Sequence, residues 1–409
     1  MRSLLFFAVA IAGAVATFAL HRPVTTTASS GVSKLPGARR AIDAGLYPSL
    51  QAAIDAVPAE GGELRIPAGT FEISEPLLVT QEDVLIQGAG TATHIKNLNT
   101  EGKPALMVRP KDLDQDPKAM QWRVMLSNFR ITGNDRSGHG IYAQNVNEIF
   151  VQGVSVSYNG GDGFLCDYCY EDPRISDSLF TYNKGTGLNL QRCHDIVVSS
   201  NQFEENNDAV RCFDGFNLCM TGNTLDDHLG NGVVIEYTYG SVLSGNMIEE
   251  CKGTAVVLDR DCYGIAISAN VIAHNDSGGV DLRDAHGCTV SANTFTLLKK
   301  DAVRIGPNSG RITVTGNNFS NSFLGNGSIR RRKNDEDAAG LVLEATRDVA
   351  IAGNVFSGLT TKAVEERSPC ERILFVGNVM TGVPSDHQQV SGVVTSNLDT
   401  LVVNPGDAK

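Results

Sequence analysis

Between positions 150 and 380 the apolar and polar positions of this chain repeat with a period of about 23 to 24 residues. Each repeat contains an Asn that follows a small residue, as in Gly222-Asn223-Thr224-Leu225. Successive copies of this Asn are one period apart, except that the step from Asn317 to Asn354 is longer and contains an insertion. The repeated residues are Asn201, Asn223, Asn246, Asn270, Asn293, Asn317, Asn354 and Asn378.

A second mark in each repeat is a Gly or Ala followed by alternating apolar residues, as in Gly187-Leu188-Asn189-Leu190. Two short stretches of period 2 per repeat, separated by Gly, Asn and Asp, predict strands rather than helices. Stacked coils of such strands form a parallel β-solenoid, with neighbouring coils about 4.8 Å apart. The repeated Asn suits tight corners, because Asn tolerates left-handed backbone and its amide can bond along the stack. The dense Leu pattern of leucine-rich repeats is absent.

The composition fits one long core. The chain has 409 residues, 42% of them hydrophobic, and contains 42 Gly. Its formal net charge is −12, which argues against nucleic acid as the partner, since that would require a basic face. The same charge disfavours a polyanionic substrate unless a cation or a basic groove intervenes.

The N-terminus has the pattern of an export signal. Arg2 precedes an apolar run from Leu4 to Leu20, and Ala14-Val15-Ala16 offers a cleavage site of small residues. We therefore predict a signal peptide over residues 1–20 and a secreted, periplasmic or cell-surface protein. An uncleaved N-terminal anchor is the alternative, and only then would the protein associate with a membrane. We expect a flexible linker over 21–40, a solenoid over 41–400, a C-terminal tail over 401–409, and a monomer.

The nine cysteines are an odd number for an exported protein. Cys166 and Cys212 fall at inward strand positions and are expected to be small buried residues. Cys169 and Cys193 are one repeat apart, so they occupy adjacent coils and a disulfide between them is geometrically feasible. No Cys spacing predicts a zinc site.

The N-terminal region of the solenoid has a capping pattern. Residues 47–57 have apolar positions at helical spacing, and residues 61–73 follow as a strand with a Pro-x-Gly turn. A short amphipathic helix of this kind closes the open end of a solenoid core. Together with Val84–Gly90 and the repeats from about 125 to 400, this segment resembles the pectin-lyase-like superfamily of pectate lyases and polygalacturonases. The resemblance implies an all-β, right-handed parallel β-helix of about eleven coils with an N-terminal capping helix.

The resemblance also implies a polysaccharide partner, but it identifies no catalytic set. Gly138-His139-Gly140 is similar to a polygalacturonase motif, yet the acidic motifs that precede it in those enzymes are missing. The Asp-Pro-His motif of alginate epimerases is also missing, and Asp172-Pro173-Arg174 is the nearest match. No family's catalytic residues are therefore carried over to this chain.

Alignment of the coils predicts a polar and aromatic groove on one strand face. Rings stack on sugar faces, while amides and charges bind hydroxyls. The substrate-binding candidates are Asp167, Tyr168, Gln191, Arg192, Arg260, Asp281 and His286. The catalytic candidates are Glu236, Asp259, Arg283 and Tyr237.

Two kinds of chemistry fit these residues. Glu236 and Asp259 fall in one column of adjacent coils, where two carboxylates about 5 Å apart would suit a retaining glycosidase. Alternatively, Arg260 and Arg283 would stabilise a substrate carboxylate in a polysaccharide lyase, with Tyr237 or His286 as the base. The carboxylates could instead hold calcium, together with Asp261 or Asp281; calcium is the one cofactor the sequence suggests, and it assigns no metal ligands.

The sequence therefore favours an exported polysaccharide lyase or glycoside hydrolase. A non-catalytic β-helix that binds a carbohydrate or a partner at the cell surface or in the periplasm is the alternative. The polar column could also serve structure alone, because alternating charges stabilise neighbouring strands. A role in copper-site maturation is disfavoured, since the Met, His and Cys clustering expected for copper is absent.

Overall fold

The computed structural model describes residues 35–321, 337–384 and 393–394. The chain divides into two units, residues 1–40 and residues 41–409, and the fold described below is that of the second. The predicted signal peptide, the linker up to residue 34 and the C-terminal tail lie outside the described residues. Within the described ranges, no helix has the length and apolar character needed to cross a membrane.

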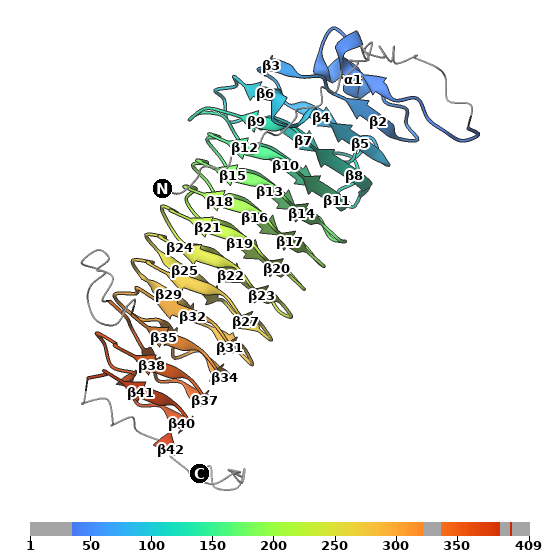
Figure 1. The fold of residues 1–409 in the computed structure, drawn as a ribbon. Coiled ribbons are helices and arrows are strands. Elements are labelled where there is room, and N and C mark those ends of the chain that lie inside the picture. The colour runs from blue at the N-terminus through green and yellow to red at the C-terminus, as the bar shows by residue number, and fades with distance from the viewer. Residues whose placement is uncertain (1–34, 322–336, 385–392, 395–409) are drawn as a thin grey trace, which may run out of the picture. The chain divides into compact units, whose positions relative to one another are not determined.

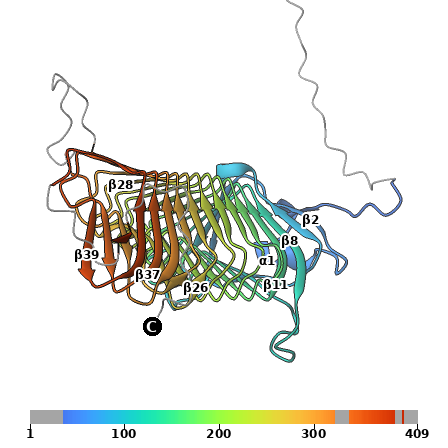
Figure 2. The same ribbon diagram turned by 90° about the horizontal axis from the view of Figure 1, so that it is seen from below.

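Three parallel sheets are built by successive coils, and a typical coil adds one strand to each sheet (Figure 1). Sheet A has 17 strands, sheet B has 13 and sheet C has 12. A typical coil passes from β17 (Val197–Ser199) in sheet A to β18 (Gln202–Glu204) in sheet B and β19 (Val210–Phe213) in sheet C. Figure 2 shows the sheet A strands β8, β11 and β37 along one side of the stack. The predicted parallel β-solenoid is confirmed.

The strands are short, and their bounds follow the repeat. Sheet A contains β1 (Ile42–Asp43), β2 (Gly62–Arg65), β5 (Val84–Gln87), β8 (Gln121–Ser127), β11 (Val146–Gln152), β14 (Arg174–Ser176), β17, β20 (Cys219–Thr221), β23 (Val242–Ser244), β26 (Cys262–Tyr263), β27 (Ala266–Ser268), β30 (Ala285–His286), β31 (Thr289–Ser291), β34 (Gly310–Thr315), β37 (Arg347–Ala352), β40 (Glu371–Val376) and β42 (Val393–Val394). Sheet B contains β3 (Gly69–Ile73), β6 (Thr93–Asn97), β9 (Arg130–Thr132), β12 (Ser155–Ser157), β15 (Leu179–Thr181), β18, β21 (Thr224–Asp226), β24 (Met247–Glu249), β28 (Val271–Ala273), β32 (Thr294–Thr296), β35 (Asn318–Ser320), β38 (Val355–Ser357) and β41 (Val379–Thr381). Sheet C contains β4 (Leu77–Val79), β7 (Leu106–Val108), β10 (Ile141–Gln144), β13 (Phe164–Asp167), β16 (Leu188–Gln191), β19, β22 (Val233–Glu236), β25 (Thr254–Asp259), β29 (Gly278–Leu282), β33 (Val303–Ile305), β36 (Leu341–Glu344) and β39 (Val364–Ser368).

The number of coils differs from the prediction, with about 14 turns instead of about eleven. The extra turns lie mainly before residue 150, where the Asn mark is absent. There the sheet A strands β2, β5 and β8 begin at residues 62, 84 and 121; the first step matches the period, but a long loop in the second step hides it in the sequence.

A column of buried asparagines joins sheet A to sheet B along most of the stack. The side-chain oxygen of Asn246 accepts the backbone N–H of Asn223 at 3.1 Å and the Nδ2 of Asn223 at 2.9 Å. Asn246 makes the same two bonds to Asn270, both 3.0 Å long. Asn317 reaches Asn354 in the same way at 2.9 and 3.0 Å, so the insertion does not interrupt the column. The amides thus satisfy corner backbone groups that would otherwise be buried without partners.

The first coil is closed by a short helix, as the capping pattern predicts. Helix α1 (Leu50–Asp55) begins after Ser49, whose side chain accepts the N–H of Ala52. Its Leu50, Ala53 and Ile54 are buried in the solenoid core. On the same helix, Gln51 accepts the N–H of Leu78 at 2.8 Å and donates to its carbonyl at 3.0 Å. The amide therefore replaces a neighbouring strand at the edge of β4, leaving less of that edge open to further pairing. Two short 3₁₀ turns, η1 (Ala44–Leu46) and η2 (Gly90–Ala92), complete the helical elements of the described part.

All nine cysteines are free. Cys166 and Cys212 are buried as predicted. Cys169 and Cys193 are buried in adjacent coils, but the disulfide considered for them is not formed. Burial raises the pKa of both thiols well above the ordinary value, which keeps them protonated and unreactive.

Candidate functional site

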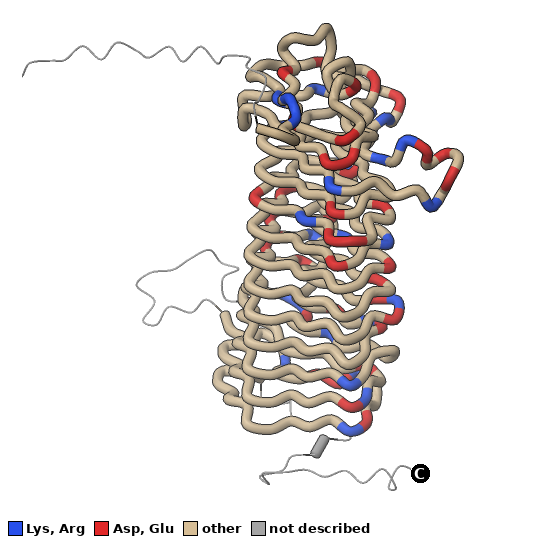
Figure 3. The backbone as a smooth tube through the Cα atoms, turned by 90° about the vertical axis from the view of Figure 1, so that its right-hand side faces the viewer, with Lys and Arg blue, Asp and Glu red and all other residues tan. Residues whose placement is uncertain are grey.

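The register of sheet C places the predicted polar column on one line of adjacent strands. Asp167 of β13 lies beside Gln191 of β16, and Gln191 lies beside Phe213 of β19. Phe213 is followed by Glu236 of β22, which is paired with Asp259 of β25. These five residues are therefore neighbours from coil to coil. Figure 3 shows that charged positions concentrate toward one side of the stack, while long stretches of the same coils away from that side carry none.

The residue after each of these strands turns outward at a sharp corner. Tyr168, Arg192, Asp214, Tyr237 and Arg260 all have positive φ, between 48° and 58°. Tyr237 donates its backbone N–H to the carbonyl of Arg260 at 2.9 Å, so the two residues follow one another along the stack. Tyr168 and Tyr237 are 42% and 50% exposed. The corner conformation thus displays the predicted tyrosines and arginines on the surface.

Glu236 is the most enclosed of the predicted catalytic residues, with 5% of its surface exposed. Its Oε2 accepts a hydrogen bond from Arg211 at 2.5 Å, and its Oε1 lies 3.2 Å from Nε of Arg260. Both carboxylate oxygens are therefore engaged by guanidinium groups. The arrangement holds Arg211 and Arg260 in place.

Asp259 begins a chain of alternating charges that runs toward the C-terminus. Its Oδ2 lies 3.7 Å from Nη1 of Arg283, whose Nε donates to Asp281 at 2.7 Å. Asp281 accepts from Arg304 at 3.0 Å, and Arg304 donates to Glu344 at 2.5 Å. The hydrogen bond from Arg304 lowers the pKa of Glu344. Of the three carboxylates in this chain, Asp259 has the most exposed side chain, at 31%.

Three predicted substrate-binding residues line one pocket. Asp167, Tyr168 and Arg192 lie around a cavity of about 480 Å³ near the loop before β8, and Arg192 donates to the carboxylate of Asp167. The remaining lining residues are Pro117, Lys118, Met120, Gln144, Asn145, Asn147 and Tyr170. Gln191, which was also predicted, does not line this pocket and instead donates weakly to Asn189 at 3.5 Å.

His286 lies apart from the column of Glu236. It belongs to β30 in sheet A and lines a second, larger pocket of about 910 Å³. Its Nε2 is 3.5 Å from a carboxylate oxygen of Asp284. The other predicted site residues all lie on or just after strands of sheet C, so His286 alone is separated from them.

The sequence pattern of the family described as "Right handed beta helix region" matches residues 118–260 and 174–319. This match agrees with the three stacked parallel sheets in showing a right-handed parallel β-helix. No curated protein matches its sequence significantly.

Several solved structures share this β-helix fold. The A-module of the mannuronan C-5 epimerase AlgE6 of Azotobacter vinelandii gives a TM-score of 0.55 at 18% identity, covering 84% of this chain and 92% of that one. Tailspike protein 3 of bacteriophage CBA120 gives 0.54 at 13% identity, covering 82% of this chain and 60% of that one. A double mutant of the periplasmic alginate epimerase AlgG gives 0.52 at 15% identity, covering 84% of each chain. At such low identities the similarity shows the fold alone.

The β-helix also carries a row of aromatic residues that sequence reasoning missed. Tyr170, His194, Phe216, Tyr239 and Tyr263 occupy equivalent turn positions in successive coils between sheets C and A. Neighbouring ring centroids are 3.9, 3.9, 4.2 and 5.3 Å apart. Because the rings contact one another, they fix the turn beside the polar column. Their recurrence once per repeat from Tyr170 to Tyr263 was the signal that could have revealed them.

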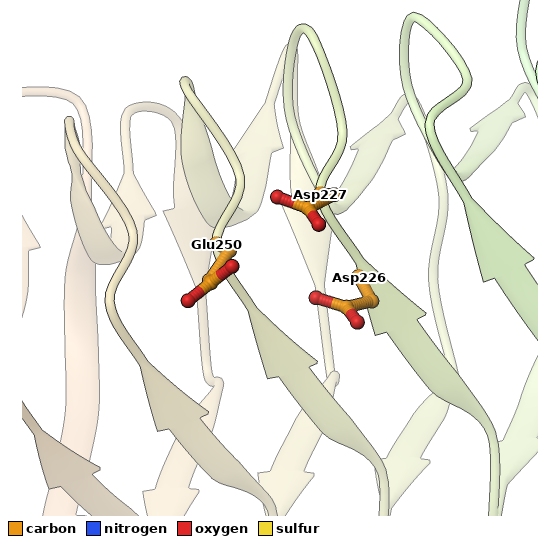
Figure 4. Close-up of side chains that lie close together, drawn as sticks. All are labelled: Asp226, Asp227 and Glu250. Atoms are coloured by element: carbon orange, nitrogen blue, oxygen red, sulfur yellow. The ribbon is translucent and has the colours of Figure 1, made fainter.

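Among the described residues, one cluster of carboxylate side chains has the geometry of a metal site, and it lies elsewhere on the β-helix. Asp226, Asp227 and Glu250 each have a carboxylate oxygen within 4.8 Å of the others (Figure 4). They lie at the ends of the sheet B strands β21 and β24, not in the Glu236 column where calcium was considered. Burial, and then the charge of Asp227, raises the pKa of Asp226. Crowded carboxylates of this kind suit a hard cation, but they are also common without one.

Proposed function

We propose that this β-helix is an enzyme that acts on a polysaccharide bound along the strand ends of sheet C. The similar solved structures support this class of substrate, since two of them are named as epimerases of mannuronan and of alginate. The polar column supports it as well, because it combines exposed tyrosines with paired charges that can bind hydroxyls.

One observation carries the catalytic part of the proposal: Tyr237 and Arg260 are adjacent and open to solvent. The two residues follow one another at the corner of sheet C, and 50% of Tyr237 and 52% of the Arg260 side chain are exposed. Asp259 lies directly before Arg260 and is partly exposed. A tyrosine at one corner is therefore followed, in the next coil, by a fixed cation and a carboxylate.

This arrangement favours proton abstraction over hydrolysis. A retaining or inverting glycosidase needs two carboxyl groups that are free to act on the glycosidic bond. Glu236 does not meet this need, because both of its oxygens are engaged by Arg211 and Arg260. Its role in the proposed enzyme is to position those arginines.

The proposed reaction is a β-elimination on a uronate-containing chain. Arg260, with Arg283 nearby, binds the sugar carboxylate and stabilises the charge that develops on it. Tyr237, acting as the base, takes the proton beside that carboxylate, and the electron pair forms a carbon–carbon double bond. The glycosidic carbon–oxygen bond at the next carbon breaks, and the leaving oxygen receives the proton that Tyr237 has taken, which returns Tyr237 to its starting state.

A polysaccharide panel, neutral and uronic, tests this function with two readouts. Elimination produces an ultraviolet-absorbing unsaturated end, whereas hydrolysis produces a reducing end without that absorbance. We expect elimination, and we expect Tyr237→Phe to lower its rate by about a hundredfold or more. Tyr158→Phe is the matched control, because Tyr158 is also exposed, at 55%, and has a similar φ of 58°, but follows a strand of sheet B. Equal rates in the two variants would refute the role of Tyr237.

A binding function without catalysis is the second candidate. The observation that favours it is the pairing of Arg192, Arg211, Arg260, Arg283 and Arg304 with carboxylates within the protein. Retention of a polysaccharide without any product, unchanged in Tyr237→Phe, would select this function.

A further inference from the structure

The pocket that contains His286 lies outside the site proposed for catalysis. It has a volume of about 910 Å³ and lies where four coils turn into sheet A. Pro307 and Pro369 contribute apolar walls, and Arg311, Arg347 and Arg372 contribute cations. Nothing in the proposed elimination uses this pocket.

Three consecutive coils place charged residues at the same corner of this pocket. Gly310 is paired with Arg347, and Arg347 is paired with Glu371, so Arg311, Asp348 and Arg372 also follow one another. These three have φ values of 55°, 58° and 51°, which display their side chains at the corner as in the candidate site. Asp348 therefore has a guanidinium-bearing residue in the coil before it and another in the coil after it.

The acidic groups in the pocket already have partners. Arg372 holds Asp348 through two hydrogen bonds, of 2.5 and 2.9 Å, and also donates to Glu371 at 3.1 Å. Asp284 faces His286 at 3.5 Å. The pocket's carboxylates are thus engaged by Arg372 and His286.

Two cations are left over. Among the described residues, neither Arg311 nor Arg347 has a carboxylate within ion-pair distance, although both line the pocket and are exposed. Both charges nevertheless act on the neighbouring carboxylate of Asp348. Arg372 lowers the pKa of Asp348 the most, and the charges of Arg347 and Arg311 lower it further. The pocket thus has two unmatched cations in a protein whose net charge is −12.

We propose that this pocket binds an oxyanion group carried by a sugar, with Arg311 and Arg347 as its ligands. A guanidinium group offers a planar pair of donors that matches the oxygens of a carboxylate, a sulfate or a phosphate. The walls formed by Pro307 and Pro369 can contact the apolar edge of the ring. This binding goes beyond the proposed elimination and does not depend on it.

The exposure of both arginines limits the strength of this site. Exposed ion pairs contribute little each, so we expect dissociation constants of about 1–10 mM. Screening by salt should weaken the binding further, because neither charge is buried.

Titration of the full chain with monosaccharides, followed by NMR or calorimetry at low salt, tests the proposal. The probes are glucuronate, glucose 6-sulfate, glucose 6-phosphate and glucose, which separate the three oxyanions from the neutral ring. We expect at least one anionic sugar to bind about fivefold or more tightly than glucose, and added salt to remove the difference. Equal binding of all four probes would overturn the proposal.

Variants locate the binding. The double variant Arg311→Ala/Arg347→Ala should bind the anionic sugars no better than glucose. Arg136→Ala is the control, because Arg136 is also exposed and has no ion-pair partner within the described ranges, but lies between β9 and β10. If the double Ala variant fails to fold, Arg311→Lys/Arg347→Lys keeps both charges and should bind with intermediate strength, since Lys lacks the planar fork. Unchanged binding in a folded double variant would overturn the assignment. Binding is measured without turnover, so failure of the elimination assay leaves this result unaffected.

Discussion

The backbone N–H of Asn206 donates to Nδ1 of His228, 3.2 Å away, in a buried column that Asn occupies in the preceding coils. In those coils Asn159 bonds Asn183, and Asn183 bonds Asn206, through the same side-chain oxygen position. His228 therefore replaces an amide with an imidazole in a fully buried place. Its Nε2 has no partner among the described residues, and burial lowers its pKa from 6.5 to about 4.

This relationship predicts a loss of stability in weak acid. The unfolded chain binds a proton at His228 near pH 6.5, whereas the folded chain resists protonation down to about pH 4. The stabilising contribution is therefore complete above pH 6.5 and is lost as the pH falls toward 4, by about 3 kcal/mol in all. His228→Asn restores the residue of the neighbouring coils and should reduce this loss. Denaturant unfolding at several pH values measures it, and an unchanged pH dependence in the variant would contradict the prediction.

The asparagine column predicts a stability difference between its middle and its end. Asn246→Ala removes the acceptor for two donors of Asn223 and leaves the Met220 carbonyl without the amide of residue 246. Each buried polar group left unpaired costs about 1–3 kcal/mol, so we expect a loss of about 3 kcal/mol or more. Asn378→Ala, at the partly exposed last step of the column, should cost less. Thermal unfolding compares the two variants, and an equal loss would contradict the predicted difference between the middle and the end of the column.

The two predicted carboxylates should differ in their effect on stability. Glu236→Gln leaves Arg211 and Arg260 without a buried counter-charge, and we expect a loss of about 2–3 kcal/mol. Asp259→Asn affects a more exposed group with one guanidinium 3.7 Å away, so we expect at most about 1 kcal/mol. Urea midpoints at low salt measure both variants. If Asp259→Asn proved the more destabilising change, the structural role assigned to Glu236 would be wrong.

The carboxylates at the edge of sheet B predict the opposite pH trend from His228. Burial and neighbouring acidic groups raise the pKa of Asp226 and of Glu249. An acid with a raised pKa in the folded state opposes folding once it ionises, so its cost appears as the pH rises through that pKa. Asp226→Asn should therefore raise the melting temperature at neutral pH, by up to about 1 °C, and have less effect near pH 4. A melting temperature that falls in the variant at neutral pH would contradict this assignment.

The architecture and the polar column could be derived from sequence because each coil repeats the same requirement. Asn223 and Asn246 bond the same backbone groups at the same corner of successive coils. Inward residues such as Cys212 and Ile235 fill equivalent places in one core, so similar residues recur along the sequence with the period of the coil. The same alignment placed Glu236 beside Asp259, since strands in a regular stack keep their register. Where loops of variable length interrupt the coils before residue 150, that register was not visible and the number of turns was underestimated.

Only the tertiary structure decided which charges neutralise one another. An arginine is long enough to reach a carboxylate in the same coil or in a neighbouring one, so spacing alone does not choose among several partners. In the folded chain Arg211 and Arg260 converge on Glu236, whereas Arg311 and Arg347 remain without a carboxylate in the described part. The repeat determined where each backbone position lies, but side-chain reach and burial determined which groups stay open to a ligand.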